Sequence, residues 1–366
     1  MGVLINPALV RRLVEQDPIP AWLGDEHNWQ RVYARTSGGN QAVLVYEPAA
    51  GASGAVCVAL GEPGQPVLGG VGPARRFHWW QDAALPALNC LAARTPRLEP
   101  VRYRPGKRCT LRSTTGRALF VKCLADQRGW AINRDARLLH RARRDGLLGF
   151  GVARPAGWLG SSRLLVQHAV PGSPVIERLR GAGGAALAAR LGAANATLAA
   201  APITPEPRFT YEEQMLRTRK YVARLAHLLP STLVISADLL KRLATVDPGP
   251  ADRPIHGAPH AHQWLDGPDG LMLVDFDRFA CGDPELDVAT FVAEADFENG
   301  ASEDIGRAYR AAFEGRWPLD PALVSAYRTH KHIAKALRVA TALRTDAAER
   351  ALAILDHARS LVGGDE

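Results

Sequence analysis

The sequence predicts an α+β fold with two lobes, a small β-rich lobe followed by a larger helical lobe, and an N-terminal extension before them. Two observations support this prediction. Short strand-like runs surround one helical pattern between residues 86 and 170, whereas residues 171–366 are dominated by helical periodicity. Pro171 and Gly172 mark the break between these regions. We therefore expect an α/β extension at 1–85, a β-rich lobe at 86–170 and a helical lobe at 171–366.

The individual elements are predicted from hydrophobic period and turn residues. In the extension we expect a helix at 7–15 and strands at 29–36, 41–46 and 55–60, as a small mixed module or as a lead-in to the next lobe. In the β-rich lobe we expect strands at 101–104, 109–113 and 118–123, a helix at 128–144, and strands at 152–158 and 163–168. In the helical lobe we expect helices at 185–200, 211–229, 233–244, 304–314, 321–343 and 346–361.

The charge of the chain is positive but not concentrated. It has 45 lysine and arginine residues against 37 acidic ones, a formal charge of +8 and a sequence pI of about 9.5. This balance is compatible with anionic partners, but the basic residues are scattered and no basic motif is interleaved with aromatic residues. The segment with the most closely spaced basic residues, at 137–144, is typical of one solvated helix face. The alternative is that some of these residues face an anion. Nucleic acid is therefore not an expected partner.

The cysteines and the apolar runs argue against a disulfide- or zinc-stabilised protein, a secreted protein and a membrane protein. Five cysteines, an odd number without a C-x-x-C pair, favour neither a disulfide framework nor a zinc site. The first residues lack the apolar core of a signal peptide. No apolar run reaches the roughly 20 residues needed to cross a bilayer. We therefore expect a reduced, cytoplasmic protein without a membrane segment.

The most informative segment of the helical lobe contains a D-x-D pair. An apolar run at 271–274 has the length of a buried strand and is followed by Asp275 and Asp277. Carboxylates at i and i+2 point to the same side of the backbone, and buried carboxylates need a partner or a metal. Gln263 precedes the pair, and a glycine-containing turn brings it back beside Asp275. Such hard oxygen ligands indicate Mg²⁺ held with substrate phosphates. The alternative is that both aspartates cap local turns.

The same segment resembles the aminoglycoside phosphotransferase and choline kinase-like superfamily, which has a protein-kinase-like fold. The superfamily pattern is H-G-D-x-H-x-x-N, a strand, D-F/W-D/E and G-D-P-x-x-D. Residues 255–291 read IHGAPHAHQWLDGPDGLMLVDFDRFACGDPELDVATF. Three strands, a helix and two strands at 86–170 also have the order of a kinase N-lobe. The resemblance implies a bilobal fold from about residue 86 to residue 361, with ATP or GTP as phosphoryl donor and Mg²⁺ as cofactor.

The resemblance implies roles for five residues of this segment. Asp275 corresponds to the metal-binding aspartate that bridges the nucleotide phosphates, and Asp277 completes the D-x-D pair. Gln263 takes the place of the asparagine that is the second metal ligand, with the same amide acceptor on a longer side chain. His256 and Asp287 correspond to residues that connect the catalytic loop to the following helix.

The resemblance also places nucleotide-binding residues in the β-rich lobe. Lys122 corresponds to the lysine that contacts the α- and β-phosphates, the alternative being a surface residue of a strand. Its usual glutamate partner is absent, and Asp135 on the following helix is the nearest candidate. The turn at 104–108 lies where a turn would cover the phosphates. The hinge that contacts the adenine is expected at Gln167, His168 and Val170.

The sequence departs from the superfamily pattern at Ala258. The superfamily has an aspartate there that accepts the proton of the attacking hydroxyl, and alanine cannot. General base catalysis contributes roughly 10²- to 10⁴-fold, whereas positioning and charge neutralisation dominate phosphoryl transfer. His260 or His262 can replace the base because an unperturbed histidine is partly neutral near pH 7. For His260, the alternative is a buried hydrogen-bonding role.

Three functions remain open at this point. The favoured class is a phosphotransferase that uses ATP and Mg²⁺ on a hydroxyl of a small molecule. The second is a pseudokinase that binds nucleotide or another ligand without turnover. The third keeps the fold but uses the metal and the histidines for different chemistry. Four acidic residues are candidates to face a cationic acceptor, the alternative being that they are solvated surface residues: Glu285, Glu294, Asp296 and Glu298.

Overall fold

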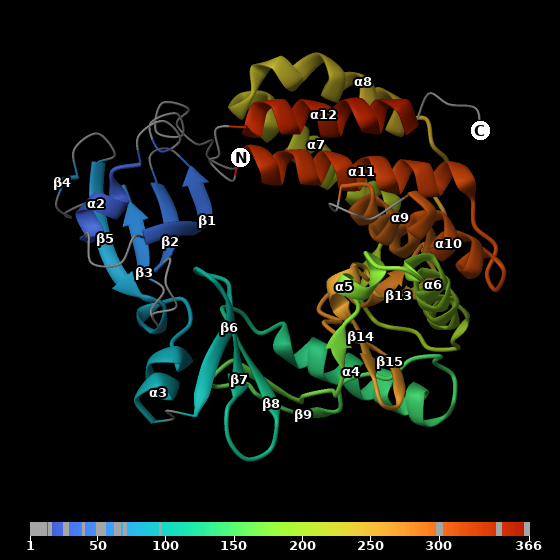
Figure 1. The fold of residues 1–366 in the computed structure, drawn as a ribbon, viewed down its shortest axis with the longest axis horizontal. Helices are drawn as coiled ribbons and strands as arrows, with labels where there is room; N and C mark the ends of the chain where they lie inside the picture. The colour runs from blue at the N-terminus through green and yellow to red at the C-terminus, as the bar shows by residue number, and fades with distance from the viewer. Residues whose placement is uncertain are drawn as a thin grey trace.

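The computed structural model describes residues 13, 17–24, 29–38, 41–48, 56–61, 67–68, 72–94, 97–297, 303–341 and 346–361. They form an α+β kinase-like architecture, with a β-rich N-terminal part and a helical C-terminal part, which confirms the predicted fold class (Figure 1). The helix expected at 7–15 lies outside the described residues except for Leu13.

The first sheet is antiparallel and belongs to the N-terminal extension. Its strand order is β1-β2-β3-β5-β4, and helix α2 (Ile19–Leu23) shares its main apolar core. The strands are β1 (Trp29–Gly38), β2 (Gln41–Pro48), β3 (Val56–Leu60), β4 (Val67–Leu68) and β5 (Gly72–His78). The three strands expected from the sequence are present, whereas β4 and β5 were not predicted.

The second sheet has the order β6-β7-β8-β10-β9 and a different helix on each face. Its strands are β6 (Leu98–Arg104), β7 (Arg108–Ser113), β8 (Leu119–Leu124), β9 (Pro155–Leu159) and β10 (Leu164–His168). Cys109 and Cys123 pack toward α3 (Ala87–Arg94) and the preceding 3₁₀ helix η2 (Trp79–Gln81). Leu124 packs toward α4 (Gly129–Arg144). Because side chains alternate along a strand, Lys122 lies on the α4 face of the sheet.

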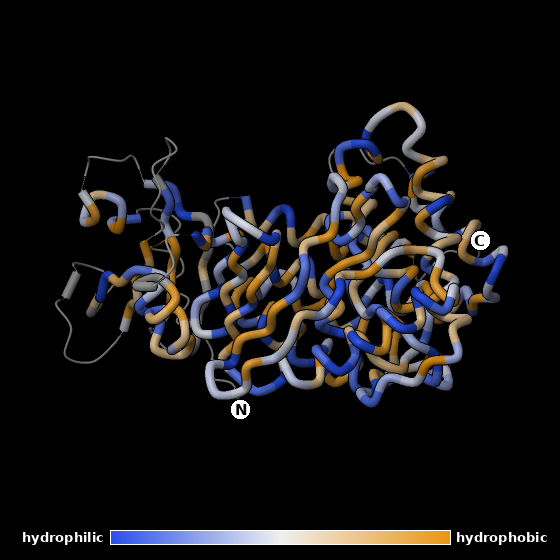
Figure 2. Tube along the Cα trace, turned by 90° about the horizontal axis from the view of Figure 1, so that it is seen from below, coloured by the Kyte–Doolittle hydropathy of each residue, from blue (hydrophilic) through white to orange (hydrophobic). Residues whose placement is uncertain are grey.

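Helices dominate the rest of the chain and form two apolar cores. The first core includes α5 (Ile176–Leu179), α6 (Gly184–Ala200), α9 (Pro284–Ala295) and α10 (Glu303–Glu314). The second includes α7 (Tyr211–Leu228), α8 (Leu233–Leu243), α11 (Pro321–Ala340) and α12 (Ala347–Leu361), with the 3₁₀ turn η3 (Pro230–Thr232) beside it. Figure 2 shows hydrophobic and hydrophilic residues alternating along this part of the trace, as amphipathic helices require. None of the described helices is long and apolar enough to span a membrane.

Two small sheets lie among these helices. One contains β11 (Ser173–Pro174), β14 (Trp264–Gly267) and β15 (Gly270–Leu273), and the other contains β12 (Arg208–Phe209), β16 (Ala280–Gly282) and β13 (Arg253–Ile255). The 3₁₀ turn η4 (Ala261–Gln263) leads directly into β14.

The N-terminal extension contacts the second sheet through Tyr103 of β6. The Tyr103 ring packs against an apolar cluster of the first sheet that includes Cys57 and Phe77. Its hydroxyl donates to Asp82 Oδ2 at 2.7 Å, and the Gly106 N–H donates to the same oxygen at 2.7 Å. One carboxylate thus holds both the β6 strand and the turn that follows it.

Candidate functional site

The hairpin β14–β15 brings Gln263 beside Asp275. Trp264 pairs with Leu273, and the Val274 N–H donates to the Gln263 carbonyl at 3.0 Å. Asp275 then leaves the strand with a φ of +66°, a left-handed conformation that is uncommon for residues other than glycine. Gln263 Nε2 lies 3.4 Å from Asp275 Oδ2, so the two side chains that the sequence assigned to a metal are in contact.

Two cations of the second sheet contact the D-x-D pair. Lys122 Nζ lies 2.5 Å from Asp275 Oδ1 and 2.6 Å from Asp277 Oδ1. Arg108 contacts Asp277, and its Nη2 lies 3.6 Å from Asp275 Oδ2. The four side chains are only 10–21% exposed. Two cations and two carboxylates therefore meet at the junction of the β-rich and helical parts.

This charge cluster shifts the protonation equilibria of its members. Burial tends to raise the pKa of Asp275, but Lys122 and Arg108 outweigh burial and hold that pKa well below its usual range. Burial tends to lower the pKa of Lys122, but Asp277 and Asp275 raise it above its usual value. At neutral pH Asp275 is thus ionised and Lys122 is protonated.

Asp287 and His256 hold the loop that precedes this hairpin. The N–H groups of His256 and Gly257 donate to the two oxygens of Asp287, at 2.8 and 2.7 Å. His256 Nδ1 accepts from the Ala258 N–H at 3.2 Å, and its Nε2 lies 3.0 Å from the Val274 carbonyl. Burial lowers the pKa of His256 to about 4, so the ring is neutral and can accept and donate in this way. These contacts connect the loop to helix α9 and to the end of β15.

His260 is held by a carboxylate that the sequence did not assign to it. Its Nδ1 lies 3.3 Å from Glu294 Oε2, and the Ala261 N–H donates to the same oxygen at 3.1 Å. The His260 N–H donates to the Ala258 carbonyl at 2.8 Å. Burial tends to raise the pKa of Glu294, but the neighbouring His260 lowers it. Glu294 therefore lies beside the histidine that comes two residues after Ala258.

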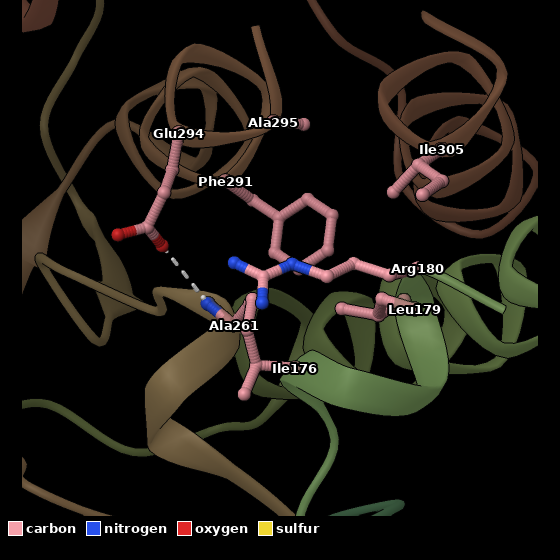
Figure 3. A pocket seen from close by; sticks show the side chains of 8 residues that line it. All are labelled: Ile176, Leu179, Arg180, Ala261, Phe291, Glu294, Ala295 and Ile305. Carbon is pink, nitrogen blue, oxygen red and sulfur yellow. Dashed lines mark hydrogen bonds between the residues drawn. The ribbon is translucent and has the colours of Figure 1, made fainter. Parts of the chain in front are cut away.

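An apolar pocket lies beside this loop (Figure 3). In Figure 3 the Phe291 ring faces the Arg180 guanidinium, and Glu294 bonds the Ala261 amide. The pocket is lined by Ile176, Leu179, Arg180, Ala261, Phe291, Glu294, Ala295 and Ile305. Because Ala261 belongs to the same loop as Ala258, the pocket is next to the position that the superfamily uses for its base.

The profile of the phosphotransferase enzyme family (APH) matches residues 112–324, more than half of the chain. The chain belongs to this family. Among solved structures, an aminoglycoside 2'-phosphotransferase of type IIIa in complex with GDP is similar, with 18% identity, a TM-score of 0.52 and coverage of 76% of this chain and 99% of that one.

Two further solved structures share the fold of this phosphotransferase-family chain. An aminoglycoside 3'-phosphotransferase of type VIII has 22% identity and a TM-score of 0.51, over 69% of this chain and 99% of its own. A choline/ethanolamine kinase family protein from Mesorhizobium loti has 17% identity and a TM-score of 0.50, over 78% and 94%. No curated protein sequence matches the chain.

One of the residues that the sequence assigned to nucleotide binding, Asp135, does not contact its expected partner Lys122. Asp135 accepts from Arg134 Nε at 2.9 Å and Nη2 at 2.7 Å, whereas Lys122 contacts the two aspartates. Gln167 pairs with Phe120 in the sheet. The other two hinge residues follow it, with His168 Nε2 lying 2.8 Å from Arg154 Nη2 and Val170 just beyond β10.

Arg108 is the functional candidate that the sequence reasoning did not single out. It lay in the turn expected to cover the phosphates, but no role toward the aspartates was assigned to it. The alternation of side chains along paired strands indicates the position of Arg108. Arg108 pairs with Leu124 and Thr110 pairs with Lys122, and paired residues share a face, so Arg108 and Lys122 lie on the same face of the sheet.

The acidic residues considered for a cationic acceptor have contacts inside the chain. Glu285 accepts from the Asp320 N–H at 3.0 Å, and Glu294 accepts from the Ala261 N–H. Asp296 accepts from Arg328 at 2.6 and 2.8 Å. Glu298 lies outside the described residues. The three described carboxylates are therefore partnered within the fold, which does not favour a dedicated binding wall for cations.

Proposed function

We propose that the chain transfers the γ-phosphoryl group of ATP or GTP to a hydroxyl of a small molecule, with Mg²⁺ as cofactor. The contact of Lys122 with Asp275 and Asp277 carries this proposal, because it joins a phosphate-binding cation to a carboxylate pair. The GDP complex of the similar 2'-phosphotransferase supports a nucleotide as the ligand. We also propose the division into an extension at 1–85, a nucleotide lobe at 86–170 and a helical lobe at 171–366.

The donor atoms around Asp275 fit Mg²⁺. The carboxylates of Asp275 and Asp277 and the amide of Gln263 offer hard oxygen ligands of the kind this ion prefers. Bound Mg²⁺ would neutralise charge on the transferred phosphoryl group. Lys122 and Arg108 are the residues of this chain that would bind and orient the phosphates.

In this proposal His260 replaces the base that Ala258 removes. Glu294 holds its Nδ1 side, which leaves Nε2 as the nitrogen that can accept the proton of the acceptor hydroxyl.

A pseudokinase is the second candidate, and Ala258 is the observation that favours it. Calorimetric titration of Mg·ATP and Mg·GTP into the wild type and Asp275→Ala is the first test. We expect binding in the wild type and at least about a tenfold loss in Asp275→Ala, as for a lost metal contact. Absence of binding to the wild type contradicts the phosphotransferase and leaves only a pseudokinase with a different ligand.

Transfer to an acceptor separates the two candidates. Mass analysis of hydroxyl compounds incubated with Mg·ATP should detect phosphorylated product with the wild type and none with Asp275→Ala. Nucleotide binding without product across the acceptors tested, and without gain in Ala258→Asp, favours the pseudokinase. A product of a different mass favours changed chemistry on the same fold.

A further inference from the structure

A second group of metal-ligating side chains lies in the helical part, outside the Lys122–Asp275 cluster. Asp296 at the end of α9, His332 on α11 and His357 on α12 each place one ligand atom within 4.8 Å of the others. His332 Nε2 lies 2.9 Å from Asp296 Oδ2, and His357 Nε2 lies 3.7 Å from the same oxygen. Two imidazoles from different helices thus point at one carboxylate oxygen.

The group is largely shielded from solvent, and two of its nitrogens, His332 Nδ1 and His357 Nε2, lack a hydrogen-bond partner among the described residues. The side chains of His332 and Asp296 are 0% and 6% exposed, and that of His357 is 36% exposed. The ring of Phe297 packs edge-on against both histidines, with centroids 5.1 and 5.3 Å away. Among the described residues, His357 Nε2 is buried without a hydrogen-bond partner. A buried polar atom without a partner is costly, so this nitrogen favours an additional ligand.

One carboxylate and two imidazoles make up the group, and both are side chains that bind divalent metal ions in proteins. Arg328 donates to both oxygens of Asp296 and fixes the plane of the carboxylate, as outer-shell partners of metal ligands do.

We propose that Asp296, His332 and His357 bind one divalent transition-metal ion of the zinc class, with water in the fourth position. Two imidazole nitrogens and one carboxylate oxygen suit Zn²⁺, whereas Mg²⁺ and Ca²⁺ prefer oxygen ligands alone. Zinc–ligand bonds of about 2.0–2.2 Å separate tetrahedral ligands by roughly 3.3–3.5 Å. That separation lies between the 2.9 and 3.7 Å that divide the two imidazole nitrogens from Asp296 Oδ2.

Such an ion would connect α9, α11 and α12 and would use none of the five cysteines. The sequence argument against zinc rested on those cysteines and did not consider histidine and aspartate ligands spread over 62 positions. The proposed site is independent of phosphoryl transfer, because none of its three ligands contacts the Lys122–Asp275 cluster among the described interactions.

The test is zinc binding to chelator-treated full-length protein, measured by competition with a coloured chelator and by elemental analysis. Wild type should bind one Zn²⁺ per chain, and His357→Ala should bind at least about tenfold more weakly. His140→Ala, a partly buried histidine on α4, is the matched control and should bind as the wild type does. Asp275→Ala should also keep the site, which separates it from the proposed Mg²⁺ site.

A second readout reports the coordination itself. Co²⁺ in place of Zn²⁺ should give the visible absorption of a four-coordinate ion in wild type and His140→Ala but not in His357→Ala. Zinc should also raise the Tm of the wild type by mass action and leave that of His357→Ala unchanged. Equal zinc affinity of folded wild type and His357→Ala overturns the proposal. So does less than one zinc ion per folded wild-type chain, which leaves only a hydrogen-bonded network around Asp296.

Discussion

In the proposed function Ala258 stands where the base is expected, and His260 lies in the same loop with Glu294 near its Nδ1. We expect His260→Ala to lower kcat by about 10²- to 10⁴-fold, because general base catalysis contributes that much. Nucleotide affinity should stay unchanged. His262→Ala, which removes an exposed neighbouring histidine, is the control and should keep its kcat.

A rescue experiment makes this assignment specific. Ala258→Asp in the His260→Ala background should restore much of the lost kcat, since an aspartate there supplies the missing base. Steady-state kinetics with a confirmed acceptor check both changes. An unaltered kcat in His260→Ala would show that this histidine only supports the loop through Glu294.

Lys331 on α11 gives the fold a pH dependence. Burial lowers the pKa of Lys331 to about 7, and Arg278 lowers it further than Asp287 can raise it. The unfolded chain therefore holds more protons than the folded one between about pH 7 and the ordinary lysine pKa. Stability consequently rises with pH through this window. Each pKa unit corresponds to about 1.4 kcal/mol, so the effect amounts to a few kcal/mol.

Chemical denaturation at several pH values checks this expectation. Between pH 7 and 9 the unfolding free energy of the wild type should rise relative to that of Lys331→Met. Lys220→Met, on an exposed position of α7, should follow the wild type. Parallel curves for wild type and Lys331→Met would mean that Lys331 stays charged in the fold.

Residues close in sequence were easier to place than distant ones. Gln263 and Asp275 could be paired because a short hairpin joins them. The contact of Lys122 with Asp275 spans 153 positions and was expected only through the resemblance. The contact of Asp135 with Arg134 was not foreseen, because helical spacing indicates a face and not which cation will reach a carboxylate.

Helices α6 and α10 approach each other at Gly192. A Cβ at this position would lie 2.1 Å from the Tyr309 carbonyl oxygen, which is backbone and cannot rotate away. Gly192→Ala should therefore lower the unfolding free energy by about 1–3 kcal/mol, the usual cost of overpacking. Gly315→Ala is the matched control, because its Cβ would meet its nearest neighbour, the Ala311 carbonyl oxygen, at 3.5 Å, in ordinary contact.

Thermal and urea unfolding compare the two glycine variants. Gly315→Ala should unfold within about 0.5 kcal/mol of the wild type. If Gly192→Ala did the same, the two helices would have to separate slightly at no cost, which contradicts tight packing there. Asn195, which donates to the Tyr309 hydroxyl at 2.9 Å, would then be the main contact between them.

Elements with strong periodicity were predicted better than short or edge elements. The helix expected at 128–144 is α4, and the one expected at 185–200 is α6, each within one residue at either end. Strand β5 was missed because Gly72–His78 contains proline and two arginines and has no clear alternation. The two-residue strand β4 is too short for any pattern.

Asp82 contacts both Tyr103 and Gly106 where the first sheet meets the second, beside the apolar contact of Tyr103 with Cys57 and Phe77. We expect Tyr103→Phe to lower the unfolding free energy by about 0.5–3 kcal/mol, since it removes a hydrogen bond to a carboxylate. Limited proteolysis should also cut the variant faster near this junction. Equal stability of Tyr103→Phe and wild type would show that the junction rests on apolar packing alone.

The sequence predicted the order of the parts but not how the extension sits on them. The strands predicted for the extension pair within one sheet. The contact of that sheet with β6 depends on Tyr103, and the alternation of side chains along β6 does not identify Cys57 and Phe77 as its neighbours. Such contacts between distant segments follow from three-dimensional packing and not from local periodicity.

Any ligand that binds at the D-x-D pair must break existing ion pairs, those of Lys122 and Arg108 with Asp275 and Asp277. A divalent ion that binds these carboxylates competes with two cations already attached to the same molecule, at a very high local concentration. Nucleotide phosphates, in turn, must attract those two cations away from the aspartates. In the proposed function, metal and nucleotide would therefore help each other, because each one would free the charged groups that the other requires. Either alone should bind far more weakly than both together.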